Sequence, residues 1–142
     1  MKKLIVALLT AAAVSPAFAS DGLAVSGKFV YLPDLMWGDQ ICFSPDARGQ
    51  QTVIDAYKTS DRQDWNVVWF CFDDTQAAAK LLGVSLKLAS GACGFEGQAS
   101  VTIANYRLYL EENDLGNDVA RLVSVQRKSE AKMLTQCDDA EY

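Results

Sequence analysis

The first nineteen residues constrain the rest of the chain most strongly, because they indicate the compartment in which it folds. A short basic start precedes the 11-residue apolar run Leu4–Val14, and Ala17-Phe18-Ala19 then places small residues two apart. This order is typical of a bacterial secretory signal peptide. The apolar run is too short to cross a bilayer, which needs about 20 residues. We therefore expect cleavage after Ala19 and one periplasmic or secreted domain over residues 20–142, with no membrane attachment after cleavage.

All four cysteines lie in this expected mature domain: Cys42, Cys71, Cys93 and Cys137. An even number of cysteines in an exported chain predicts two disulfide bonds. Three pairings are possible, and we favour Cys42–Cys71, between two expected core strands, and Cys93–Cys137, which would tie the tail to the middle of the chain. A functional thiol is disfavoured, because the sequence has no Cys-x-x-Cys motif and no histidine to lower a thiol pKa.

Apolar residues in alternating or continuous runs predict a chain rich in strands. The expected strands span residues 23–31, 40–43, 52–57, 65–72, 84–88, 98–110 and 119–127. Within the sixth of these the apolar parity changes, which predicts a β-bulge near Asn105. Residues 47–51 and 89–97 are expected to be loops, and the tail over 128–136 has a weakly helical pattern.

One short helix is expected, near residues 74–82. Asp73 followed by Gln76 resembles a capping box at its start, and Gly83 suits the position after its end. The order of strands, one helix and further strands predicts a mainly β fold, a small antiparallel barrel that is OB-fold-like. This match is one of element order alone, so an SH3-like barrel and a small β-sandwich remain alternatives.

Charge and composition narrow the classes of ligand. Removing residues 1–19, which carry two lysines and no acid, changes the formal net charge from −5 to −7. An acidic surface repels nucleic acid and anionic membranes, whereas a cationic protein partner would be electrostatically favoured. The absence of histidine removes Ser-His-Asp and Cys-His nucleophile systems and most transition-metal sites. We therefore expect no cofactor and no metal.

Two motifs could still carry catalysis. An acidic turn contains Glu111, Glu112, Asp114 and Asp118, and a pair of these carboxylates could serve glycoside hydrolysis or weak calcium binding. Its spacing does not fit an EF-hand loop, and exposed acidic turns are common. Ser129 and Lys132 match Ser-x-x-Lys, but the companion motifs of penicillin-interacting enzymes are missing.

The candidate binding residues are large side chains at expected strand connections and on an expected open sheet face. The first group is Leu35, Met36 and Trp37, and the second is Tyr106, Arg107 and Tyr109. Exposed, such groups would form a hot spot for a protein, whereas buried they would only pack the barrel. We expect a non-enzymatic binding or inhibitory module of the bacterial cell envelope that acts on a protein. A small hydrolase using the acidic turn and a structural accessory protein are the alternatives.

Overall fold

The computed structural model describes residues 22–35, 38–58, 67–109 and 117–137, so the expected signal peptide lies outside the described residues. In this part of the chain no helix is long and apolar enough to span a membrane. The elements, in order, are β1 (Leu23–Tyr31), β2 (Ile41–Pro45), α1 (Ala47–Tyr57), β3 (Phe70–Phe72), α2 (Thr75–Leu82), β4 (Gly94–Arg107), β5 (Asp118–Lys128) and β6 (Lys132–Leu134).

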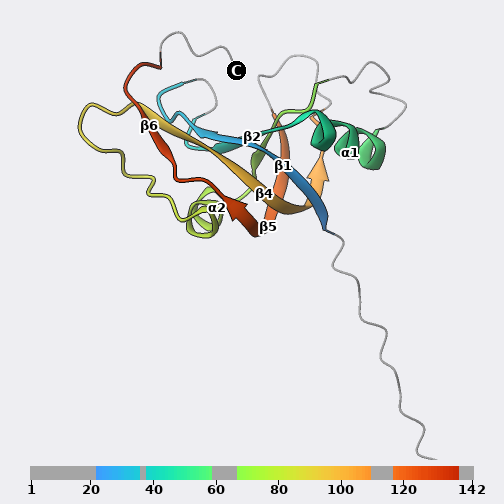
Figure 1. Ribbon diagram of the computed structural model, residues 1–142. Coiled ribbons are helices and arrows are strands. Elements are labelled where there is room, and N and C mark those ends of the chain that lie inside the picture. Colours follow the sequence, from blue (N-terminus) through green and yellow to red (C-terminus); the bar gives the residue numbers. More distant parts are fainter. Residues whose placement is uncertain (1–21, 36–37, 59–66, 110–116, 138–142) are drawn as a thin grey trace, which may run out of the picture.

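The fold is mainly β, and five of its strands form a closed ring. They follow the order β1-β2-β3-β5-β4, and β4 pairs back onto β1 to close it. The pairings are antiparallel except for β3 with β5, which is parallel, so the expected wholly antiparallel arrangement is wrong at this contact. The parallel pair arises because α2 and β4 carry the chain back before β5 begins. Helix α1 lies beside β1, and α2 lies near β5 (Figure 1).

Close backbone approach shapes the ring at Gly27. This residue faces Pro45 of β2 on one side and Ala99 of β4 on the other. A Cβ atom at this position would collide with the Ser44 carbonyl oxygen and with the Pro45 backbone. Glycine therefore lets the backbones of β1 and β2 approach one another closely at this position.

Two apolar clusters lie on opposite faces of the strands. The inner cluster fills the ring and contains the fully buried side chains of Phe29, Phe43, Phe70, Phe72 and Phe95. A smaller cluster, here called the outer cluster, comprises Val30, Leu32, Cys42, Cys71 and Cys137. Successive strand residues point to opposite faces, so Cys42 and Cys71 lie outside the ring while their phenylalanine neighbours lie inside it. The strands β2 and β3 are thus buried on both faces.

Helix α2 confirms the helix expected near residues 74–82. Its N-cap is Asp74 rather than Asp73, and the Asp74 carboxylate accepts a hydrogen bond of 2.9 Å from the Ala77 N–H. Gly83 ends the helix in the left-handed region, with φ of 68°. The Lys128 ammonium donates to the Leu82 carbonyl oxygen at 2.7 Å, which joins the end of the helix to β5.

Helix α1 overturns the expected strand over 52–57 and the expected loop over 47–51, so the described residues form two helices where one was expected. Asp46 accepts a hydrogen bond from the Gly49 N–H at 2.8 Å and starts the helix one residue before Ala47. Gly49 and Val53 are buried and lie four residues apart, as one face of a helix requires. The apolar run from Val53 resembled a strand because its β-branched residues favour strands in isolation.

Other expected elements differ in extent. The bulge near Asn105 is confirmed, because Asn105 has φ of 51° and the register with β5 shifts between Ala104 and Arg107. Residues 84–88 form no strand, and of the described part of 65–72 only Phe70–Phe72 does. The expected weakly helical tail instead contributes β6, which pairs with Gly94–Glu96 where β5 has already left β4.

Candidate functional site

Two disulfides hold the outer cluster together, and both expected pairings are confirmed. Cys42–Cys71 joins directly opposed residues of β2 and β3, whose Cα atoms are 3.8 Å apart. Cys93–Cys137 joins the start of β4 to the tail, with Cα atoms 6.2 Å apart. All four cysteines are therefore oxidised, which fits an extracytoplasmic, oxidising setting.

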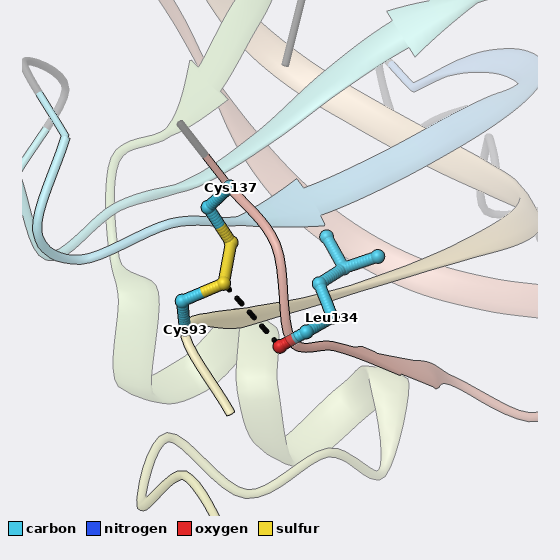
Figure 2. The surroundings of a disulfide bond; sticks show 3 residues. All are labelled: Cys93, Leu134 and Cys137. Carbon is cyan, nitrogen blue, oxygen red and sulfur yellow. Dashed lines mark hydrogen bonds between the residues drawn. A yellow bond between two sulfur atoms is a disulfide. The ribbon is translucent and has the colours of Figure 1, made fainter. Parts of the chain in front are cut away.

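Figure 2 shows how the second disulfide fastens the tail. The dashed line in Figure 2 joins the Cys93 sulfur to the carbonyl oxygen of Leu134. The Cys93 N–H also donates a hydrogen bond of 2.8 Å to that oxygen. The Cys93 sulfur lies 3.4 Å from the same oxygen, and because a disulfide sulfur carries no proton this is a close contact only. Leu134 packs against the outer cluster, and Cys137 belongs to it. The segment from β6 to Cys137 is thus held against the outside of the ring.

The connection between β1 and β2, residues 32–40 and here called the β1–β2 loop, begins on this cluster. Leu32 is buried in the outer cluster, and Leu35 is half-buried against it. The Leu35 N–H donates to the Leu32 carbonyl oxygen at 3.1 Å, which forms a turn. Met36 and Trp37, the other candidate binding residues of this group, lie outside the described residues. The described part of the expected binding site, Leu35, therefore packs on an apolar cluster that is linked by disulfides.

The β1–β2 loop carries only negative charge. Asp34 and Asp39 are its charged residues, and both are exposed. Their field reaches Tyr31 at the end of β1, whose phenol lies 3.5 Å from the Asp39 carboxylate. The pKa of Tyr31 is raised, first because the phenol is buried and then because of Asp39 and Asp34. This end of the molecule therefore combines apolar side chains with a negative potential.

The second group of candidate residues lies apart from the first. Tyr106 is buried, and its ring stacks on that of Tyr57 with centroids 4.9 Å apart. Arg107 is exposed, and Tyr109 is half-buried. Tyr106 therefore belongs to the inner cluster and does not present its ring beside Arg107 on an open face.

The acidic turn has one member in the described residues, and that member has structural partners. The Asp118 carboxylate is buried, and it accepts hydrogen bonds of 2.8 Å from the Tyr106 hydroxyl and from the Tyr109 N–H. Glu111, Glu112 and Asp114 lie outside the described residues. Within the described ranges, no group of three acidic, cysteine or histidine residues is arranged to hold a metal ion.

Within the described residues, a polar groove on the outer face of β1 and β4 contains none of the expected binding residues. Its larger half, of about 560 Å³, is lined by residues that include Ser26, Arg48 and Ser100. Its smaller half, of about 410 Å³, shares Ser26 and Ser100 and reaches Arg127. In the sequence, polar residues alternate with apolar ones in the strands expected at 23–31 and 98–110. That the polar faces of these two strands lie side by side follows only from the β1–β4 pairing.

Comparison of the chain with protein-family models, with curated proteins and with solved structures found no match.

Proposed function

We propose that the chain is an exported, non-enzymatic binding module of the bacterial cell envelope, and that its β1–β2 loop docks on a cationic protein. The observation that carries this proposal is the position of Leu35, which rests on the disulfide-linked outer cluster in a loop whose two charged residues, Asp34 and Asp39, are both exposed. An apolar centre surrounded by a polar, solvent-accessible rim is the usual anatomy of a protein–protein interface.

We further propose that the ring is OB-fold-like. In support, the strand order is β1-β2-β3-β5-β4, the β3–β5 pair is parallel, and α2 lies between β3 and β4 in the chain. OB-folds bind ligands on the face of their second and third strands and on the loops between strands 1 and 2 and between strands 4 and 5. Those places correspond here to the β1–β2 loop, to the face that carries Cys42–Cys71 and to residues 108–117.

The two disulfides give this surface the rigidity that binding needs. A loop that is already fixed at its base loses less conformational entropy when a partner binds. Leu32, Cys42 and Cys71 are each at most 3% exposed, so the base of the loop is packed as tightly as a core. The negative field of Asp34 and Asp39 would mainly raise the rate at which a cationic partner associates.

The experiment starts from residues 20–142 immobilised and exposed to periplasmic extract of the producing cells. Retained proteins are eluted with about 0.5 M salt, because this salt shortens the range of interactions between exposed charges to a few ångströms. They are then identified by mass spectrometry. The Kd of the purified partner is then measured for the parent protein, for D34N/D39N and for L35A. We expect a partner of high pI, such as a cationic wall-degrading enzyme or an imported toxin, and a Kd raised about tenfold or more by each variant.

The matched control is D55N/E130Q, which removes the same charge from exposed positions on α1 and after β5. If binding depends on net charge alone, this control and D34N/D39N will weaken it equally, and the proposed docking surface is then wrong. If the immobilised protein cleaves or modifies a retained partner, the non-enzymatic part of the proposal is wrong.

A further inference from the structure

The polar groove on the outer face of β1 and β4 is separate from the surface proposed above and has its own chemistry. Its two halves share Ser26, Asp46 and Ser100, so they form one continuous depression. The start of α1 bounds it on one side, and the end of β5 bounds it on the other. A groove of this size falls in the range of small-molecule sites, about 300–1,000 Å³.

The floor of the groove contains hydroxyl and amide groups that are hydrogen-bonded to one another, beside small apolar residues such as Ala24 and Ala99. The hydroxyls of Ser26 and Ser100, from neighbouring strands, are 2.7 Å apart. The Gln126 side-chain amide donates to the hydroxyls of Thr102 and Ser124 at 2.9 and 2.8 Å. Hydroxyls keep further donor and acceptor capacity after one hydrogen bond, so this floor can still bind the hydroxyl groups of a ligand.

The charge of the groove is opposite in sign to that of the whole protein. Arg48 lines the larger half and Arg127 the smaller half, and both are exposed. Among the described residues neither guanidinium pairs with a carboxylate. The remaining charged groups have partners, since Asp46 accepts from the Gly49 N–H and Lys128 donates to the Leu82 carbonyl oxygen. Two guanidinium groups thus flank a hydroxyl-rich floor in a protein whose net charge is negative.

We propose that this groove binds a short anionic saccharide, with one acidic group near Arg48 and another near Arg127. Guanidinium groups bind carboxylates and phosphates through paired hydrogen bonds, and the serine, threonine and glutamine groups between them suit sugar hydroxyls. No aromatic residue lines either half within the described part of the chain, so the affinity must come from polar contacts rather than from stacking. Binding should therefore weaken steeply as salt is added.

The test uses isotope-labelled residues 20–142 and three probes followed by NMR and calorimetry. The first probe is tetragalacturonate, the second its methyl ester, which keeps the hydroxyls and loses the charge, and the third fructose 1,6-bisphosphate, which carries two phosphates. We expect saturable binding of at least one anionic probe, with amide shifts concentrated at Ser26, Gly49 and Ser100. Which of the two anions binds identifies the acidic group as a carboxylate or a phosphate.

Variants locate the binding and separate it from overall charge. R48Q and R127Q should each raise the Kd of the bound probe about tenfold, because each removes charge-assisted hydrogen bonds. S26A/S100A removes both members of a hydrogen-bonded pair and should weaken binding without leaving an unpaired hydroxyl. K80Q/K87Q removes two exposed charges outside the groove and should leave the Kd unchanged.

Thermal unfolding of each variant separates lost binding from lost folding. The proposal is overturned if neither anion saturates, if the methyl ester binds as tightly as the acid, or if R48Q and R127Q bind like K80Q/K87Q while remaining folded. It stands on its own beside the proposed protein-binding role, because the β1–β2 loop variants D34N/D39N leave every residue of the groove intact.

Discussion

The hydroxyl of Tyr106 donates a 2.8 Å hydrogen bond to the buried carboxylate of Asp118. The two residues lie at the end of β4 and the start of β5, so this bond joins the two sides of the connection between those strands. The N–H of Tyr109 donates to the other carboxylate oxygen of Asp118 at 2.8 Å. A carboxylate that sequence alone placed in an exposed acidic turn therefore organises the base of that connection.

Replacing Tyr106 by phenylalanine should destabilise the protein by about 1–3 kcal/mol, because a buried carboxylate would lose a donor. Urea-induced unfolding followed by circular dichroism measures this difference. The control is Y57F, which keeps the stacked ring and removes a hydroxyl from a half-buried side chain. Equal effects of Y106F and Y57F would show that the bond to Asp118 contributes nothing special.

The two disulfides should contribute differently to the native state. The exported protein should have an intact mass about 4 Da below that of fully reduced residues 20–142, one hydrogen lost per sulfur. C93A/C137A should lower the free energy of unfolding by about 2–4 kcal/mol, because the unfolded chain is no longer constrained by the bond. C42A/C71A should cost more, because both sulfurs are buried and their removal leaves a cavity.

Hydrogen exchange distinguishes the roles of these two bonds further. In C93A/C137A the amides of β6 should exchange faster while those of β2 and β3 stay protected, since only the tail loses its anchor. Fast exchange confined to β2 and β3 would contradict this assignment.

The N-cap of α2 should be Asp74 rather than its neighbour. D74A should lower the free energy of unfolding by about 1 kcal/mol, because the Ala77 N–H loses its acceptor. D74S supplies another good capping oxygen and should restore most of that loss. If D74S is as unstable as D74A, the carboxylate acts in some way other than as a cap.

The stability of the fold should fall at alkaline pH in part because of Tyr31. Burial first, and then Asp39 and Asp34, raise the pKa of Tyr31 in the folded state. Since the unfolded chain then loses this proton more readily, the contribution is fully present below about pH 10 and is lost as the pH rises through the folded-state pKa.

Absorbance titration of the tyrosines checks this expectation. Relative to the parent protein, Y31F should remove one transition with a raised pKa, and D39N should move that transition to lower pH. An unchanged titration curve for D39N would mean that the Asp39 charge does not act on the phenol.

Much of the ring could be predicted from residue patterns that depend on near neighbours. The strand at 23–31, the bulge at Asn105 and the helix ending at Gly83 each have a local cause, namely parity, a change of parity and a left-handed residue. The pairing of the cysteines was also accessible, because Cys42 and Cys71 lay in two expected core strands, which the structure shows to be paired.

The errors arose where distant contacts decide the local structure. Residues 52–57 favour a strand by composition, and the cap at Asp46 together with burial of Val53 makes them a helix. Likewise β6 exists only because β4 offers it a partner more than thirty residues earlier in the chain. The polar groove depends on the contact between Ser26 and Ser100, which are 74 residues apart in the chain. A pattern among neighbouring residues cannot predict such a contact.

The parallel β3–β5 pair spans only three residues, from Phe70 opposite Asp118 to Phe72 opposite Ala120. The sheet therefore becomes a ring only once a segment near the end of the chain has returned to its middle. A nascent chain that stops short of Ala120 keeps two unpaired strand edges, and such edges invite association with other chains. The ring can accordingly close only after residues 118–120 are available to pair with β3, and a piece that ends before them is not a smaller version of this fold.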